Sequence, residues 1–156
     1  MSQSPGIQHQ RTLGRVMMPL YKQAHDHRLG ILLSRCSVKL SEQTLVEPDL
    51  LFVSRKRREI VGEQYIVGAP DLIIEIISPG SEMIDWVFKR DVYARYGVPN
   101  YWVAHPQDEW LRAYSLGADG QYELTGEAHG EMTFTARPFP DLEIPLARLW
   151  AERPAR

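Results

Sequence analysis

The sequence predicts an α/β fold in which a mixed β-sheet has helices packed against it. An amphipathic segment near the start indicates a helix, and a β-branched apolar run in the middle of the chain indicates a buried strand. Several short segments separated by turns follow in the second half and indicate antiparallel strands. Helices and strands do not alternate regularly along the chain, so their order argues against a doubly wound sheet.

The composition is typical of one globular domain. The chain has 156 residues, of which 44% are hydrophobic and 24% are charged, and one domain usually contains about 100–200 residues. We assign residues 1–8 to a flexible tail, because they are polar and show no periodicity, and residues 9–156 to a single domain. The formal net charge of -2 argues against a protein that coats nucleic acid, which would be basic.

The sequence also predicts the compartment. The single cysteine, Cys36, cannot form an internal disulfide, which favours a reducing cytoplasm. No apolar run approaches the ~20 residues that span a bilayer, and the first ten residues lack the pattern of a signal peptide. We therefore expect a cytoplasmic protein that does not associate with a membrane.

Residues 9–28 show the spacing of an amphipathic helix. Apolar side chains recur there at steps of three and four residues, at Leu13, Val16, Met17, Leu20 and Tyr21. Pro19 conflicts with this pattern, because proline removes a backbone donor and clashes with the preceding turn. We therefore expect a kink or a break near Met18.

Two strands are predicted next. Residues 31–40 end in an alternation of apolar and polar side chains, which is typical of a strand with one wet face. The polar stretch 41–44 predicts a turn, and residues 50–53 form a second apolar strand, so we expect a hairpin. Residues 54–68 form a polar connection with a short strand or turn at 65–67.

The run 72–77 is short, continuous and apolar, as expected for a strand buried on both faces. Ser81 is a candidate N-cap for a helix over 82–96. The apolar stripe of this helix is predicted to consist of Ile84, Val87, Phe88 and Val92. Further strands are predicted at 101–104, 110–115, 122–126 and 131–135. The proline-rich segment 136–150 is expected to close the domain with one helical turn.

Three carboxylates stand at or within predicted strands. Asp49 and Asp71 each follow a proline and open a strand, and Glu75 lies inside the apolar run. Because side chains alternate along a strand, Asp71 and Glu75 project from the same face. A carboxylate in an aliphatic strand is costly unless it is paired or binds a cation. The structural alternatives are a salt bridge to an arginine or lysine, or a turn position after proline for Asp71.

Lys89 adds a cation on the second predicted helix. It follows Asp85 by four residues, so the local interpretation is an exposed ion pair on the helix surface. The functional interpretation requires the helix to pack so that Lys89 reaches over the carboxylates.

These residues belong to a longer set of motifs, which are Pro48-Asp49, GAPDLIIEIISPGS (68–81), Asp85, Lys89, Tyr93 and GVPNYWVAHP (97–106). In this order and at this approximate spacing, they resemble the Uma-type restriction endonuclease family of the PD-(D/E)xK nuclease superfamily. The resemblance extends from about residue 9 to residue 150. It implies a restriction-endonuclease-like core.

The resemblance also implies a metal-dependent endonuclease that hydrolyses DNA. Asp49, Asp71 and Glu75 are expected to hold Mg²⁺ or Mn²⁺, hard cations that prefer carboxylate and water oxygens. Ile77 stands where the superfamily usually has a lysine, and the family places that lysine on the following helix, at Lys89. With Asp49, Asp71 and Glu75, Lys89 completes the expected catalytic set, where it orients or deprotonates the attacking water.

Further expectations concern partners. Asp85 matches a motif position without an assigned role. The basic run Arg55, Lys56, Arg57 and Arg58 is predicted to contact DNA phosphates, which position the substrate without reading its sequence. A solvated loop is the alternative for this run. By analogy with nucleases that cut two strands with two active sites, we expect a homodimer.

A second class of function stays open. Family members usually carry an acidic segment before the first helix, whereas this chain begins just before that helix, so we expect an acidic residue of the site to be missing. The protein would then be a truncated, catalytically inactive relative that binds nucleic acid or a protein partner. A homo-oligomerising scaffold is a third hypothesis. Metal binding by the carboxylates discriminates the endonuclease from the other two.

Overall fold

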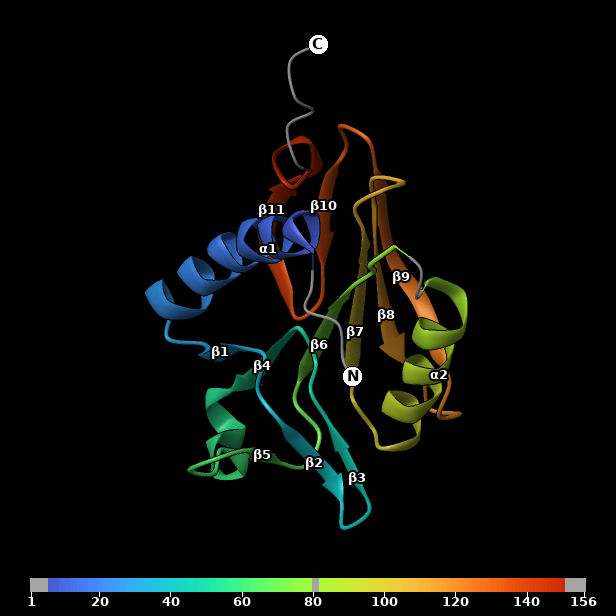
Figure 1. Cartoon of the computed structure of the whole chain (residues 1–156). Helices are drawn as coiled ribbons and strands as arrows, with labels where there is room; N and C mark the ends of the chain where they lie inside the picture. Colours follow the sequence, from blue (N-terminus) through green and yellow to red (C-terminus); the bar gives the residue numbers. More distant parts are fainter. Residues whose placement is uncertain (1–5, 80–81, 151–156) are drawn as a thin grey trace.

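The computed structural model describes residues 6–79 and 82–150, with side chains from Trp86 onward in the second helix. Its centre is a six-stranded sheet in the order β1-β4-β6-β7-β8-β9 (Figure 1). These strands are β1 (Gly30–Ser34), β4 (Leu50–Ser54), β6 (Leu72–Ile76), β7 (Asn100–His105), β8 (Trp110–Leu116) and β9 (Tyr122–His129). β6 and β7 run parallel and the other neighbours run antiparallel, which confirms the predicted mixed sheet.

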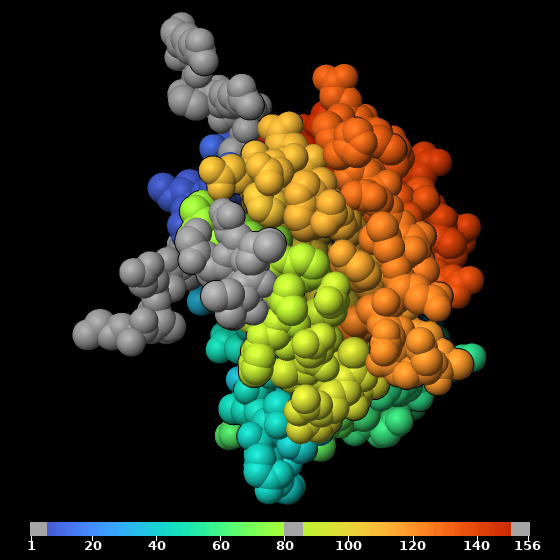
Figure 2. All heavy atoms as spheres, turned by 90° about the vertical axis from the view of Figure 1, so that its right-hand side faces the viewer, coloured from blue at the N-terminus to red at the C-terminus, as the bar shows by residue number. Residues whose placement is uncertain are grey.

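The two helices pack on opposite faces of this sheet. Residues of α1 (Ile7–Asp26) pack with one set of strand side chains, and Tyr93 of α2 (Glu82–Arg95) packs with the other set. A hairpin of β10 and β11 adds to the α1 face, and a small sheet, β3-β2-β5, adds to the α2 face. Figure 2 shows the face that carries α2, which lies beside the strands of the second half of the chain.

β6 is buried on both faces, as its apolar sequence predicts. All five of its residues are buried. Leu72 and Ile74 belong to the core under α1, whereas Ile73 belongs to the core under α2, because successive side chains of a strand point to opposite faces. Glu75 shares the parity of Ile73 and therefore faces the α2 side.

α1 begins at Ile7, two residues before the predicted start, and continues through Pro19. Of the two expectations for Met18, the break is therefore wrong, and the kink stays a prediction. Val16 and Leu20 are buried against the sheet. This packing outweighs the local cost of the proline, because most helix stability in proteins comes from burying an apolar face.

The predicted strand 31–40 is interrupted. β1 ends at Ser34, and Arg35 then adopts a φ of 50°, which takes the chain away from the main sheet. The small sheet contains β2 (Val38–Ser41), β3 (Thr44–Val46) and β5 (Ile66–Val67). The expected hairpin is thus an antiparallel β1–β4 pair with a second hairpin, β2–β3, inserted between its strands. The alternation of apolar and polar residues does not reveal the positive φ at Arg35, because such a φ is uncommon outside glycine.

The bounds of α2 agree with the predicted helix to within one residue. Its predicted apolar stripe is wrong at two positions, because Val87 is 37% exposed and Phe88 is 66% exposed. The buried face instead carries Tyr93, whose ring packs on the sheet while its hydroxyl finds a polar partner there. The predicted cap Ser81 and the side chain of Ile84 lie outside the described residues.

The predicted strands after residue 100 are confirmed as β7, β8, β9 and β10 (Thr133–Ala136). The closing segment contains the predicted helical turn, η2 (Leu146–Arg148), and also β11 (Phe139–Pro145), which we did not predict. Proline disfavours a strand interior but is tolerated at sheet edges, and β11 pairs only with β10 within the described residues. Within residues 6–79 and 82–150, no helix has both the length and the apolar character that crossing a bilayer requires.

Candidate active site

The β4–β6 ladder brings Asp49 and Glu75 together. The antiparallel register pairs Leu50 with Ile74, so its continuation by one residue places Asp49 opposite Glu75. Directly opposed residues have Cβ atoms about 5 Å apart. Oδ2 of Asp49 also accepts a hydrogen bond from the Ile76 amide at 2.8 Å, which fixes the carboxylate at this end of the ladder. Both acidic side chains line one pocket of about 120 Å³.

Glu75 is held by α2. The Tyr93 hydroxyl donates a hydrogen bond to Oε1 of Glu75 at 2.5 Å, and Nζ of Lys89 lies 3.6 Å from Oε2. Glu75 is only 5% exposed. Burial raises its pKa to about 7, the nearby ammonium of Lys89 opposes this change, and the negative charge of Asp49 adds to it. A bound cation beside Glu75 would stabilise its ionised form, which burial disfavours.

Lys89 is placed as the functional interpretation requires. It lines the same pocket as the two carboxylates, its Nζ lies 3.6 Å from Oε2 of Glu75, and its side chain is 37% exposed. The side chain of Asp85, the partner in the local interpretation, lies outside the described residues. The structure thus brings together three predicted site residues from three elements: Asp49, Glu75 and Lys89.

His9 of α1 completes the polar lining and was not among the predicted site residues. Its Nε2 lies 3.2 Å from Oδ2 of Asp49, and the residue is 7% exposed. Burial alone would raise the pKa of Asp49, but hydrogen bonds from His9 and the Ile76 amide outweigh burial and hold that pKa below its ordinary value. The sequence contains a signal that His9 faces the protein interior. His9 precedes the buried Val16 by seven residues, so it lies on the core-facing stripe of the helix.

Asp71 does not join this pocket. Its Oδ2 accepts a hydrogen bond from the Ser54 amide at 2.7 Å and lies 3.6 Å from Nη1 of Arg57. Asp71 and Glu75 share the parity of one strand face, as predicted, but four residues of strand separate them by roughly 13 Å. The expectation of a three-carboxylate site is therefore not met.

The predicted basic run also lies at the far end of β4. Arg55, Lys56, Arg57 and Arg58 fall within a short 3-10 helix, η1 (Arg55–Ile60). Arg57 pairs with Asp71, as described above. Asp49 and Arg55 stand six positions apart along an extended strand, which corresponds to roughly 20 Å. None of the four basic side chains lines the carboxylate pocket.

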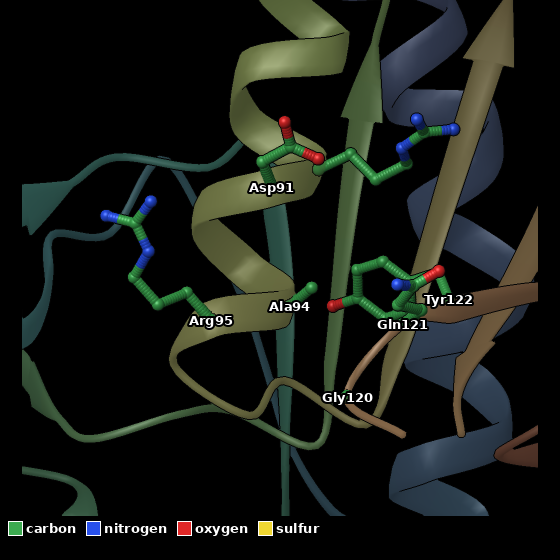
Figure 3. A pocket seen from close by; sticks show the side chains of 7 residues that line it. Asp91, Ala94, Arg95, Gly120, Gln121 and Tyr122 are labelled. Carbon is green, nitrogen blue, oxygen red and sulfur yellow. The ribbon is translucent and has the colours of Figure 1, made fainter. Parts of the chain in front are cut away.

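A larger pocket of about 490 Å³ lies between α2 and the turn that joins β8 to β9. Figure 3 shows Asp91, Ala94 and Arg95 on the helix, with Gly120, Gln121 and Tyr122 beside them. The charges in its lining are mixed. None of the predicted catalytic residues lines it, so its size alone does not make it the active site.

The donor set of the small pocket fits Mg²⁺ or Mn²⁺. Mg²⁺ is usually bound by one or two carboxylates, with water and substrate phosphate completing its coordination. Asp49 and Glu75 supply two adjacent carboxylates, and the pocket volume exceeds the ~30 Å³ that a water molecule occupies in the liquid. Within the described residues, no group of three or more His, Cys, Asp or Glu side chains is placed to form a cage made by the protein alone.

Comparison with protein families identifies the family of this chain. The Uma2 family, described as "Putative restriction endonuclease", matches residues 1–147. The chain belongs to the Uma2 family. This match covers Asp49, Glu75 and Lys89, and it confirms the resemblance found in the sequence.

Comparison with solved structures gives one match that supports the fold. A crystal structure described as a putative nuclease belonging to DUF820, from Anabaena variabilis, is similar with a TM-score of 0.77 at 15% identity, covering 96% of this chain and 84% of that chain. The type IIG restriction endonuclease BpuSI gives a TM-score of 0.48 at 11% identity, covering 78% of this chain and 13% of that chain. No curated protein matches this chain. The Uma2 chain thus shares the fold of the Anabaena DUF820 protein.

Proposed function

We propose that this Uma2 protein is a metal-dependent endonuclease that hydrolyses phosphodiester bonds in DNA. One observation carries the proposal: Asp49, Glu75 and Lys89, which come from three separate elements, line the same pocket. Membership of a restriction endonuclease family supplies the class of reaction and of substrate. Two adjacent carboxylates suit a metal ion that assists phosphodiester hydrolysis, and a nearby amine can stabilise the negative charge that develops on the phosphate.

Asp49 and Glu75 are the proposed ligands of Mg²⁺ or Mn²⁺. When bound, such an ion polarises the scissile phosphate and lowers the pKa of a coordinated water. Asp71 is not included, because it is committed to the Ser54 amide and to Arg57 at the other end of β6.

The other residues of the pocket position these groups. His9 and the Ile76 amide orient the carboxylate of Asp49, and the Tyr93 hydroxyl orients that of Glu75. Lys89 is the proposed catalytic amine. Its ammonium lies 3.6 Å from Glu75, where it can orient an attacking water and offset the negative charge that develops on the phosphate.

Metal binding tests the proposal without any assumption about the DNA sequence. Calorimetric titration with Mn²⁺ should show saturable binding by the wild type, and Glu75→Gln should abolish it. Asp71→Asn is the matched control, because it also replaces a carboxylate by an amide, directly before β6 and outside the pocket, and it should leave Mn²⁺ binding intact. An equal loss in both variants would contradict the proposed site.

DNA cleavage then tests the role of Lys89. With Mn²⁺ present, Lys89→Met should retain metal binding and lose cleavage by a factor of at least about 100, the contribution typical of a general acid or base. Retained cleavage in Lys89→Met would remove the lysine from the mechanism and leave the metal site standing.

An inactive relative is the second candidate, and the ion pair between Lys89 and Glu75 favours it, because an internal cation can take the place of a metal. In that case Lys89→Met would show stronger Mn²⁺ binding than the wild type, and the wild type would bind DNA without cleaving it. The endonuclease proposal requires that the wild type binds Mn²⁺ despite this pair.

Two further parts of the proposal rest on sequence alone. We propose a homodimer, because two active sites can cut two strands, and a cytoplasmic location, because the chain has a single cysteine. Sedimentation of the protein alone and with duplex DNA measures the first, and a monomeric mass in both conditions would contradict it.

A further inference from the structure

A second pocket, distant from the carboxylates, is lined by three arginines. Arg28, Arg55 and Arg58 line a pocket of about 230 Å³ that contains no acidic residue. Within the described residues, none of these three side chains has an ion-pair partner. Three uncompensated guanidinium groups around one cavity are suited to an anion with several oxygen atoms, and phosphate matches the paired donors of arginine.

The fold itself brings these arginines together. The β1–β4 register pairs Gly30 with Ser54, so the residues before Gly30 lie against those after Ser54. The Arg55 amide donates a hydrogen bond to the carbonyl oxygen of Leu29 at 2.9 Å, which ties the end of α1 to the start of η1. Side chains three residues apart in a 3-10 helix lie on one side, which places Arg58 with Arg55.

Arg57 does not line this pocket. Its backbone departs from helical geometry, with φ -114° and ψ 19°, and its side chain pairs with Asp71. The four-residue basic run predicted as one interface is thus divided: Arg55 and Arg58 line the pocket, and Arg57 pairs with Asp71.

Arg28 occupies a backbone position that favours glycine. It follows the end of α1 with a φ of 52°, in the left-handed region that costs energy for most L residues. A helix commonly ends with glycine at such a position. A strained backbone that presents a charged side chain to a cavity is typical of a binding site.

The floor of the pocket is apolar. Ile31 and Val53, which face each other across the β1–β4 ladder, line it together with Gly30. Ile31 is 41% exposed. A Cβ at Gly30 would lie 2.1 Å from the carbonyl oxygen of Val53, so only glycine allows this close approach. An apolar floor under a cationic rim suits a phosphate attached to a sugar rather than a free inorganic ion.

We propose that Arg28, Arg55 and Arg58 bind a backbone phosphate of DNA at a distance from the bond that is cleaved. The proposal rests on the proposed function for its ligand, because an endonuclease must hold DNA on both sides of the reacting phosphate. The roughly 20 Å between Asp49 and Arg55 corresponds to about six base pairs of duplex at 3.4 Å per pair. The arginine pocket therefore contributes to affinity and not to chemistry.

Salt dependence of binding tests this pocket separately from cleavage. Fluorescence anisotropy with a duplex of about 20 base pairs, without divalent metal and from about 50 to about 300 mM KCl, gives the slope of log K against log [salt]. Each arginine that neutralises one phosphate contributes about 0.9 to that slope. Arg28→Gly and Arg58→Gln should each reduce it by about this amount.

The variants are chosen so that loss of folding does not imitate the result. Arg28→Gly places glycine at a left-handed position, so it removes the guanidinium and relieves the backbone; a circular dichroism melt verifies that it is folded. Lys56→Gln removes a charge from the same 3-10 helix outside the pocket and is the control. Slopes unchanged in both arginine variants, or reduced equally by Lys56→Gln, would overturn the pocket.

A titration with deoxyadenosine monophosphate and with inorganic phosphate distinguishes the source of the phosphate. Weak binding of the nucleotide that Arg28→Gly abolishes, together with a reduced DNA slope, supports the proposal. Nucleotide binding without any change in the DNA slope would assign the pocket to a free nucleotide and overturn the proposal. Wild-type protein that binds no DNA would also overturn the proposal. Wild type that binds DNA but never cleaves it would refute the endonuclease and leave the pocket supported.

Discussion

Tyr93 donates its hydroxyl hydrogen to Oε1 of Glu75 at 2.5 Å, and both residues are buried. The hydroxyl belongs to α2 and the carboxyl group to β6, so the contact joins the second helix to the central strand. It stabilises the ionised form of Glu75 in a place where burial opposes ionisation. Burial outweighs this hydrogen bond, because the pKa of Glu75 is still raised to about 7. Ionised Glu75 therefore destabilises the metal-free protein, and a bound cation would offset that cost.

The metal-free protein should lose stability as pH rises from about 4.5 to about 7. Glu75 has an ordinary pKa of 4.5 and a folded pKa of about 7, so the folded state binds more protons in this window, and the free energy of unfolding falls by up to about 3 kcal/mol. Asp49 acts in the opposite direction, but its lowered pKa affects stability only below about pH 3.8. Urea denaturation of metal-free protein at a series of pH values measures the effect. Glu75→Gln should flatten the profile, and a wild-type profile that rises across this window would contradict the assignment.

Tyr93→Phe should destabilise the protein more at pH 8 than at pH 5. At pH 8 Glu75 is ionised and loses a hydrogen bond to a charged group, which costs about 2 kcal/mol, whereas at pH 5 it is largely protonated. Because the hydroxyl lowers the pKa of Glu75, its removal should also extend the decline of stability to higher pH. Urea denaturation of Tyr93→Phe at the two pH values measures both effects. A double-mutant cycle with Glu75→Gln gives the coupling, and a coupling near zero at pH 8 would show that the contact contributes nothing.

The sequence predicts the elements that one physical signal dominates. The run around Glu75 is apolar without interruption because β6 is covered on both faces, and the bounds of α2 follow from its spacing and from Gly97 at its end. The pairing of Asp49 with Glu75 was expected from the family resemblance. The β4–β6 register supplies its physical reason, since it sets the two residues opposite each other.

The misplaced residues show what a pattern does not contain. Asp71 has the same strand parity as Glu75, but parity fixes a face and not a position along the strand. Arg57 pairs with Asp71, and its backbone departs from helical φ and ψ, which a run of charged residues does not predict. Phe88 is apolar yet 66% exposed, whereas Tyr93 of the same helix is buried and bonds to Glu75 of the sheet.

Gly30→Ala should destabilise the fold by at least about 2 kcal/mol, in the range of strained or overpacked substitutions. The new Cβ would meet the Val53 carbonyl oxygen at 2.1 Å, and backbone atoms cannot yield as a flexible side chain does. Gly14→Ala is the matched control, because Gly14 lies inside α1 with nothing within 4 Å of the new Cβ. That variant should gain about 0.5–1 kcal/mol, the helix-interior difference between alanine and glycine. Thermal and urea unfolding of both variants measure the pair, and equal effects would contradict the close approach of β1 to β4.

His9 should affect metal affinity more than it affects the fold. It is a positioning residue, since its Nε2 holds the carboxylate of Asp49, and loss of such a partner typically weakens metal binding by about 10–100-fold. His9→Leu should show that weakening in Mn²⁺ calorimetry, and His9→Gln should recover part of the affinity through its amide donor. Thr12→Val is the matched control in the same helix. The Thr12 hydroxyl is buried without a hydrogen-bond partner among the described residues, so its removal should leave Mn²⁺ binding unchanged and stability equal or higher. Unchanged Mn²⁺ affinity in His9→Leu would mean that the Ile76 amide alone orients Asp49, and that the histidine only fills space between α1 and the sheet.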